Sequence, residues 1–275
     1  MLQKGPGGEF SAVTQMGILV TNDDGIDSPG LWALAEAMSR LGETVVVAPR
    51  EERSGVGTGI SLHAGMSVAR VPSPLPGVTA YAVGGTPGDC VILGLRRLAR
   101  GHIGLVVSGI NLGANLGNDI LCSGTVMATL QAYFRKIPSL ALSLVMDSKT
   151  EVPRFDVISK VAGVLARGII DGTLPDVAVL NVNAPNSPPQ EVKGIAVTRT
   201  ASSGYVRLSE VGGRSDMTYD RGVRARDQLI IEEGTDIWAI SAGLISITPL
   251  RFDVTDCNRT STLAERVALL RSELA

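Results

Sequence analysis

The feature that most restricts the fold is a regular alternation of short apolar runs with segments of helical periodicity. Residues 17–21 form a continuous apolar run, which is typical of a strand covered on both faces. A helical pattern follows at residues 29–41, with Ser28 as its N-cap and Gly42 as its end, and a second buried-type strand lies at 44–48. This order predicts parallel pairing with a right-handed crossover.

The alternation continues along most of the chain. A capping-box pattern at Thr86, Pro87 and Asp89 predicts the start of another helix. Further strands are expected at residues 79–83, 105–108, 140–144 and 177–182, and further helices at 125–134 and 157–170. The fold class predicted from this pattern is α/β, a doubly wound, mostly parallel, Rossmann-like sheet.

Changes in composition and periodicity along the chain indicate the domain organisation. Residues 1–15 are Gly-rich and predict a disordered N-terminal extension, whereas 16–255 are expected to form one α/β domain. Within it, residues 185–250 read as a hairpin and oligomerisation extension, with short strands at 195–200, 229–231 and 244–248 around a polar segment at 202–226. Residues 256–275 predict a C-terminal helix, placed at 262–274.

Composition narrows the function classes. The chain is 44% hydrophobic and 19% charged, which is ordinary for a globular protein, and its net charge of −2 disfavours a general nucleic-acid or membrane-surface binder. Cys90, Cys122 and Cys257 show no disulfide or zinc spacing, and no apolar run approaches the ~20 residues that span a bilayer. A cytoplasmic protein without nucleic-acid or membrane partners is expected.

Polar clusters follow three of the predicted strands. Asp23 and Asp24 come after the first strand, Ser54 lies in the segment after the second, and residues 109–115 follow the strand that is expected to end at Ser108. In open α/β sheets, ligands bind where the carboxyl ends of the strands meet. We therefore expect these clusters to converge on one edge of the sheet.

The adjacent carboxylates of Asp23 and Asp24 repel each other, so the folded chain must compensate for this repulsion. Two like charges ~4 Å apart repel by about 4 kcal/mol at an effective dielectric constant of 20, so either one carboxyl is protonated or a cation lies between them. Gly25 permits a turn that brings both inward. Two solvated loop aspartates are the plain alternative, but the position after a core strand favours a metal.

The remaining candidate ligands are neutral oxygens, from Ser54 and Asn111, which suit Mg²⁺ or Mn²⁺. With two histidines in the chain, a histidine-rich zinc site is excluded. Ser123, Gly124 and Thr125 open a predicted helix and favour a phosphate cradle over a plain N-cap. Cys90 and Arg96 have the spacing of cysteine phosphatases, but the apolar residues between them indicate a core cysteine.

Taken together, these motifs resemble the SurE family of nucleotidases, in order, from about residue 16 to residue 255. The residues that carry the resemblance are 18–26 (ILVTNDDGI), 46–49 (VVAP), 54–57 (SGVG), 85–91 (GTPGDCV), 107–111 (VSGIN), 123–126 (SGTV) and 245–250 (ISITPL), with Asp253 and Thr255.

The resemblance implies a site and an activity. One divalent ion per subunit would be held by Asp23, Asp24, Ser54 and Asn111, and the phosphate would face Asn115, Ser123, Gly124 and Thr125. The family hydrolyses nucleoside 5′- or 3′-monophosphates, and some members trim short polyphosphate. Homodimers or homotetramers, in which C-terminal segments reach a neighbour, are implied. Cys122, where the family often has Tyr, and Gln131, where an acidic residue is common, bear on substrate preference.

The chemistry expected is metal-assisted hydrolysis, with Asp23 or Asp24 as general base. A covalent aspartyl-phosphate is the less favoured mechanism, because Asp24-Gly25-Ile26 lacks the Asp-x-Asp-x-Thr arrangement of haloacid-dehalogenase-like phosphatases. Two other functions remain open. One is a sugar-nucleotide transferase that uses the two aspartates to hold Mn²⁺, and the other is a nucleotide-binding regulatory module on the same fold.

Overall fold

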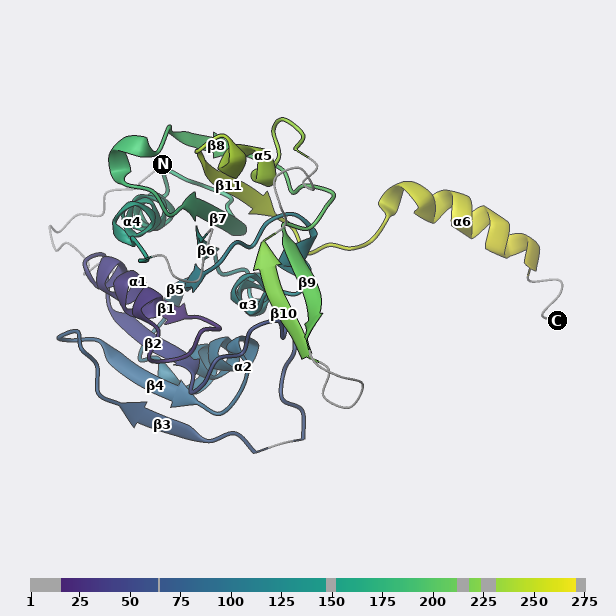
Figure 1. Ribbon diagram of the computed structural model, residues 1–275. Coiled ribbons are helices and arrows are strands. Elements are labelled where there is room, and N and C mark those ends of the chain that lie inside the picture. Colours follow the sequence, from purple (N-terminus) through teal and green to yellow (C-terminus); the bar gives the residue numbers. More distant parts are fainter. Residues whose placement is uncertain (1–15, 64, 147–151, 212–217, 224–230, 271–275) are drawn as a thin grey trace, which may run out of the picture.

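The computed structural model describes residues 16–63, 65–146, 152–211, 218–223 and 231–270. Nine strands form one sheet in the order β3-β4-β2-β1-β5-β6-β7-β11-β8 (Figure 1). They are β1 (Gly17–Thr21), β2 (Thr44–Pro49), β3 (Val68–Val71), β4 (Thr79–Val83), β5 (Ile103–Leu112), β6 (Ser139–Val145), β7 (Val179–Pro185), β8 (Ile195–Val197) and β11 (Ile245–Leu250).

Most of the sheet is parallel. The neighbours from β4 through β2, β1, β5 and β6 to β7 all pair in parallel, whereas β3 and β11 run antiparallel to β4 and β7. Every residue of β1, β2 and β6 is buried. Apolar runs of this kind need cover on both faces, so the predicted α/β class is confirmed.

Helices supply that cover. The α-helices in the described residues are α1 (Pro29–Ser39), α2 (Pro87–Leu93), α3 (Gly124–Tyr133), α4 (Asp156–Ile170), α5 (Asp236–Ser241) and α6 (Cys257–Leu270), of which α6 does not contact the sheet. α1 and α4 pack side by side on one face of the sheet, and α2 and α3 on the other (Figure 1). The capping box at α2 is present, because the Thr86 hydroxyl accepts from the Asp89 amide and the Asp89 carboxylate from the Thr86 amide.

The path of the chain creates a switch point in the middle of the sheet. From β1 the chain moves outward through β2 and ends on the β4–β3 edge, and it then returns to β5 on the other side of β1. The helices that follow β1 and β5, α1 and α3, therefore pack on opposite faces of the sheet. In doubly wound sheets, ligands bind outside the carboxyl ends of the strands at such a switch point.

Several details differ from the sequence expectations. The strand expected at 105–108 does not end at Ser108, because β5 continues to Leu112 with an irregular register against β6 between Ser108 and Asn111. The antiparallel edge strand β3 and the short helix α5 were not expected. Two of the strands expected in the 185–250 extension, β8 and β11, belong to the main sheet.

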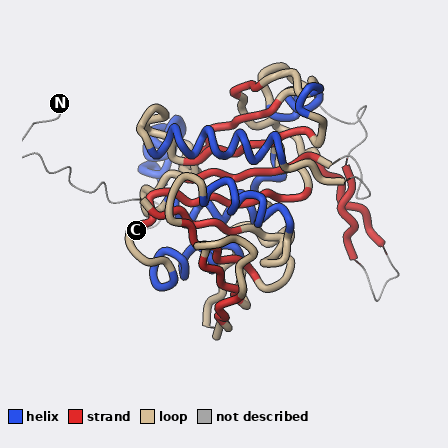
Figure 2. The backbone as a smooth tube through the Cα atoms, turned by 90° about the vertical axis from the view of Figure 1, so that its left-hand side faces the viewer, coloured by secondary structure: helices blue, strands red, loops and turns tan. Residues whose placement is uncertain are grey.

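The rest of that extension forms a separate hairpin. β9 (Val206–Val211) and β10 (Thr218–Val223) pair with each other, outside the main sheet, and project from the body (Figure 2). α6 begins earlier than expected, at Cys257, and stands away from the rest of the chain (Figure 1). The expected extension at 1–15, the strand residues 229–230 and the end of the helix at 271–275 lie outside the described residues. Among the helices described, none has the length and apolarity needed to cross a membrane.

Candidate active site at the switch point between β1 and β5

The two aspartates predicted from the sequence lie directly after β1, at the switch point. Asp23 is 4% exposed and Asp24 is half-buried. Asp23 Oδ1 accepts a hydrogen bond from the Thr125 hydroxyl at the start of α3, whereas Asp24 Oδ2 accepts from the backbone amide of Leu112 at the end of β5, at 3.3 Å. The adjacent carboxylates therefore reach two different elements and connect β1 to both.

The turn after the aspartates depends on Gly25. Its φ of +100° lies in the region that favours glycine, and a Cβ there would come within 3.2 Å of the Glu51 carbonyl carbon. The Asn22 side chain closes the turn, because its Nδ2 donates to the Gly25 carbonyl at 2.9 Å. The turn expected at Gly25 is therefore present.

Ser54 lies in the loop that follows β2. The loop is tied to the aspartates, since the amide of Arg53 donates to the Asp23 carbonyl at 2.7 Å. The Ser54 side chain is exposed, and its hydroxyl donates to the Glu52 carboxylate at 2.7 Å. The structure therefore brings Ser54 to the same sheet edge as Asp23 with its hydroxyl engaged by a neighbouring residue.

Asn111 is in a strand and not in a loop. It is 4% exposed and follows the irregularity in β5, where Ser108 pairs with Ala141 and Asn111 with Ser143. Three residues of β5 thus match two of β6, as in a β-bulge, a device that redirects side chains next to active sites. The Asn111 side chain Nδ2 donates to the Gly113 carbonyl at 2.7 Å.

The predicted phosphate cradle is the start of α3. Ser123 is its N-cap, and the Ser123 hydroxyl accepts from the Val126 amide at 3.1 Å. A Cβ at Gly124 would lie 2.8 Å from the Asp23 Cβ, so only glycine allows this close approach. The helix N-terminus and the Asp23 carboxylate are therefore in direct contact, an arrangement that stabilises the negative charge.

Asn115 is more buried than we expect for a loop residue that contacts a substrate. It is 1% exposed, and its Nδ2 donates to the Ser143 hydroxyl on β6 at 2.7 Å. Its backbone amide and carbonyl bond to the side chains of Asn181 and Asn183 on β7. This network was missed in the sequence, because its partners are 28 to 68 residues away in the chain.

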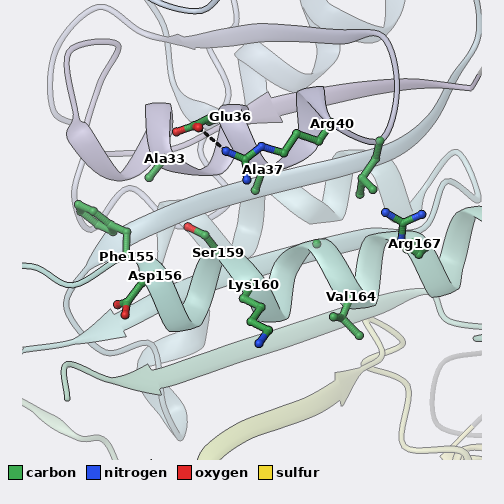
Figure 3. Close-up of a pocket in the computed structure, with 12 residues that line it drawn as sticks. Ala33, Glu36, Ala37, Arg40, Phe155, Asp156, Ser159, Lys160, Val164 and Arg167 are labelled. Carbon is green, nitrogen blue, oxygen red and sulfur yellow. Dashed lines mark hydrogen bonds and ion pairs between the residues drawn. The ribbon is translucent and has the colours of Figure 1, made fainter. Parts of the chain in front are cut away.

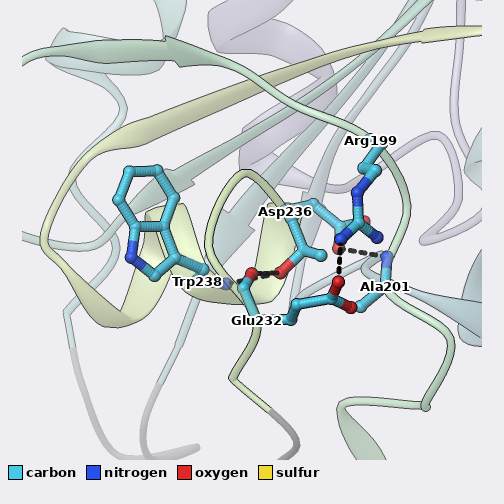
Figure 4. A network of polar contacts seen from close by, with 6 residues as sticks. Arg199, Ala201, Glu232, Asp236 and Trp238 are labelled. Carbon is cyan, nitrogen blue, oxygen red and sulfur yellow. Dashed lines mark hydrogen bonds and ion pairs between the residues drawn. The ribbon is translucent and has the colours of Figure 1, made fainter.

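A second buried carboxylate holds the loop between Asn115 and α3. Asp236 Oδ2 accepts from the amide of Gly117, and its Oδ1 accepts from the amide of Ile237. Its Oδ1 also accepts from the amide of Ala201 (Figure 4). Burial raises the pKa of Asp236 above the usual carboxyl value, although these three hydrogen bonds act in the opposite direction. Asp236 was not singled out in the sequence, where nothing marks it as buried.

The same loop is attached to the root of the β9–β10 hairpin. The Asn118 amide donates to the Ser203 carbonyl at 3.2 Å, and the Asp119 carboxylate accepts from the Tyr205 amide at 2.7 Å. Gly117 forms an isolated bridge with Gly204. Since β9 begins at Val206, the hairpin starts one residue beyond this attachment, next to the segment that leads into α3.

The donor set fits a hard divalent cation. In the described part of the chain, no three side chains of His, Cys, Asp or Glu gather as a metal cluster, so an ion at Asp23 and Asp24 needs neutral oxygens as well. Ser54 and Asn111 supply such oxygens on the same sheet edge, and oxygen ligands suit Mg²⁺ or Mn²⁺. The buried, unpartnered Oδ1 of Asn22 beside Asp23 is a further oxygen at this place.

Two other features of the chain do not form the site. A groove between α1 and α4 is lined by Glu36, Arg40, Lys160 and Arg167 and contains none of the predicted site residues (Figure 3). The Cys90 side chain is fully buried, and burial raises the pKa of its thiol far above the usual value, so a reactive thiolate is disfavoured. The interpretation of Cys90 as a core residue is confirmed.

Comparisons with known proteins identify the family of the chain. The family model described as survival protein SurE matches residues 18–207. Proteins named 5′-nucleotidase SurE are 43% identical in Moorella thermoacetica, over 92% of this chain and 96% of the relative, and 42% identical in Dehalococcoides mccartyi, over 86% and 88%. The crystal structure of a SurE protein from Aquifex aeolicus covers 90% of this chain and 98% of its own, with 36% identity and a TM-score of 0.74.

Proposed function

The chain belongs to the survival protein SurE family, and from this premise we propose that it is a 5′-nucleotidase that uses one divalent metal ion to hydrolyse nucleoside monophosphates. The observation that carries the proposal is the pair of carboxylates at the switch point, in contact with both the end of β5 and the start of α3. Relatives named 5′-nucleotidase support the substrate class.

The metal ligands proposed are Asp23, Asp24, Ser54 and Asn111, with Mg²⁺ or Mn²⁺ as the ion. When bound, such an ion supplies positive charge to a phosphate oxygen and lowers the pKa of water. The Thr125 hydroxyl orients the Asp23 carboxylate. Asp24 is the more exposed carboxylate of the two, so we assign it the role of proton acceptor from the attacking water.

The phosphate is proposed to bind at the start of α3. Amides in the first turn of a helix have no carbonyl partner within the helix, and the helix dipole favours an anion there. Ser123 satisfies the amide of Val126, which leaves the amides of Gly124 and Thr125 for phosphate oxygens. Asn115 contributes by shaping the loop before α3, since its side-chain amide already donates to Ser143.

Activity on 3′-monophosphates and on short polyphosphate belongs to the same proposal, because a site that recognises mainly a phosphate group tolerates different leaving groups. A sugar-nucleotide transferase and a non-catalytic nucleotide-binding module are the rival functions. Release of inorganic phosphate without an acceptor substrate argues against the first, and turnover itself argues against the second.

A homodimer or homotetramer is proposed as the active form. α6 stands away from the body, and its Leu263 and Val267 side chains are 61% and 45% exposed. A 14-residue helix is marginally stable alone in water, so packing against a neighbouring subunit would stabilise it.

The direct test is a phosphate-release screen of the wild-type protein. Purified protein stripped with a chelator is assayed on 5′-monophosphates, 3′-monophosphates, a sugar nucleotide and short polyphosphate, each with Mg²⁺, Mn²⁺ or no metal. We expect metal-dependent release from 5′-monophosphates. Equal release without metal would refute metal dependence, and absence of release from every nucleotide under all conditions would refute the nucleotidase.

A further inference from the structure

We propose that Asn183 is a positioning residue of the active site, which holds the backbone of Asn115 and thereby the loop between Asn111 and the start of α3. The inference rests on the proposed function, because it assigns a task to a residue that lies behind the proposed metal and phosphate ligands. Asn183 is on β7, two strands away from β5, and is fully buried.

The contact between Asn183 and Asn115 has two hydrogen bonds. The backbone amide of Asn115 donates to Asn183 Oδ1 at 2.9 Å, and Asn183 Nδ2 donates to the Asn115 carbonyl at 3.0 Å. A side-chain amide here pairs with the backbone of one residue as a neighbouring strand would. The loop leaves the sheet at Leu112, and Asn183 supplies the pairing that the sheet no longer provides.

Other strand residues converge on the same loop residue. Asn181 Nδ2 donates to the Asn115 carbonyl at 2.9 Å, and the Ser143 hydroxyl accepts from Asn115 Nδ2 at 2.7 Å. All of these side chains are buried. Polar groups in the middle of a sheet lower stability unless they are hydrogen-bonded, so three of them directed at one residue indicate that the position of that residue matters.

The residue type at 183 follows from the contact. Aspartate would keep the acceptor for the Asn115 amide but lose the donor to its carbonyl, and leucine would lose both. Asparagine therefore satisfies both backbone groups of Asn115. Without it, the buried amide and carbonyl of Asn115 would be left without the Asn183 partner, and the loop would shift to find others.

A shift of this loop would move the site at both of its ends. Asn111 lies four residues before Asn115, and Ser123 lies eight residues after it. Small displacements of groups that bind the reacting atoms reduce rates strongly. The role of Asn183 is therefore indirect: it sets where Asn111 and the first amides of α3 stand relative to Asp23 and Asp24.

The experiment compares Asn183→Ala with Asn181→Ala and with the matched control Thr248→Val. Thr248 is also buried, pairs with Asn181 across β7 and β11, and bonds to Thr198 but not to the loop. Three quantities are measured for each: the thermal melt, the hydrogen exchange of the Asn115 amide, and the Mn²⁺ concentration for half-maximal phosphate release together with kcat and KM.

We expect Asn183→Ala to expose the Asn115 amide to exchange and to lower kcat/KM or raise the Mn²⁺ requirement about 10-fold or more, as loss of an outer support of a metal site does. Asn181→Ala should change the same quantities in the same direction but less, because it removes one bond. Thr248→Val should lower the melting temperature without changing Asn115 exchange, KM or the Mn²⁺ requirement.

The proposal is overturned if Asn183→Ala lowers only the melting temperature, with Asn115 exchange, KM and the Mn²⁺ requirement as in wild type. If Asn183→Ala does not fold, the same criterion applies to Asn181→Ala. If wild-type protein releases no phosphate, the proposed nucleotidase function fails, whereas the exchange of the Asn115 amide still decides whether Asn183 holds the loop.

Discussion

The Asp23 carboxylate is held by a residue 102 positions away in the chain, the Thr125 hydroxyl, while Asp24 reaches the Leu112 amide 88 positions away. Each aspartate is therefore placed by tertiary structure and not by its own loop alone. The sequence identifies the pair, through its position after a core strand, but the partners of the pair are visible only in the fold.

Thr125→Val tests the link between α3 and Asp23. Valine keeps the volume of threonine but removes the donor, so the buried carboxylate loses one hydrogen bond, at a cost of about 1–3 kcal/mol in the free energy of unfolding. We expect a several-fold higher Mn²⁺ requirement for phosphate release. The matched control is Thr129→Val, which removes a hydroxyl that donates to the Val126 carbonyl in the same helix. Equal Mn²⁺ requirements for both variants would contradict the link.

Ser54→Ala is expected to weaken the metal site without abolishing activity. The Ser54 hydroxyl is the proposed neutral ligand and lies on an exposed loop, so water can replace it. Titration of phosphate release with Mn²⁺ should show a higher requirement and partial recovery at saturation. Complete inactivity at every Mn²⁺ concentration, with an unchanged thermal melt, would show that Ser54 has another role.

The raised pKa of Asp236 predicts how the stability of the protein depends on pH. Because burial raises its pKa in the folded state, the folded protein binds this proton more tightly than the unfolded chain does. The stability from Asp236 is therefore greatest at acid pH, below the unfolded value of about 3.9, and falls as pH rises through the folded pKa. The melting temperature of Asp236→Asn, relative to wild type, should improve as pH is raised from about 4 to 7.

Asp171→Asn is the control of opposite sign. Hydrogen bonds from the Thr173 hydroxyl and amide lower the pKa of Asp171, so wild-type protein gains stability from this group as pH rises and loses it as pH falls. This change occurs below the unfolded carboxyl value of about 3.9, so thermal melts from about pH 2 to 5 should show Asp171→Asn becoming less stable relative to wild type as pH rises. If both variants follow the same trend, burial of Asp236 is not the cause.

At the scale of elements, the buried runs and the capping signals were predictable because they act locally. β4 has the expected bounds, and α2 has the capping box read from Thr86 and Asp89. The bulge that extends β5 to Asn111 was not predictable, since it depends on pairing with β6. The strand β3 was not predicted, because its residues alternate between exposed and half-buried at a sheet edge and do not form a buried apolar run.

The candidate site likewise contains residues that the sequence predicts and residues that it does not. Asp23, Asp24 and the start of α3 follow strand ends and a helix start, which periodicity reveals. Asn181, Asn183 and Asp236 lie on β7 and α5, and the residues that they contact in the loop before α3, Asn115 and Gly117, lie 66 to 119 positions away in the chain. No local pattern marks a buried polar residue as the partner of a distant loop.

At the scale of the whole molecule, the β9–β10 hairpin projects from the body at the loop that leads into α3 (Figure 2). We expect deletion of residues 206–223, closed by a short Gly-Ser linker, to shift the native mass toward monomer, because an isolated two-stranded hairpin needs packing to be stable. Light scattering gives the mass, and a thermal melt shows that the body remains folded. An unchanged oligomer would contradict a role of the hairpin in assembly.

The central claim is that Asp23 and Asp24 hold a metal ion required for hydrolysis. The most direct measurement is phosphate release from a nucleoside 5′-monophosphate in saturating Mn²⁺ by Asp23→Asn, Asp24→Asn and the control Asp27→Asn, whose side chain is exposed beside the same turn. Both site variants should stay folded and lose nearly all activity, because removal of one negative charge weakens the ion's site, whereas Asp27→Asn should retain wild-type turnover. Wild-type turnover by either folded site variant would show that the two aspartates are not the metal site.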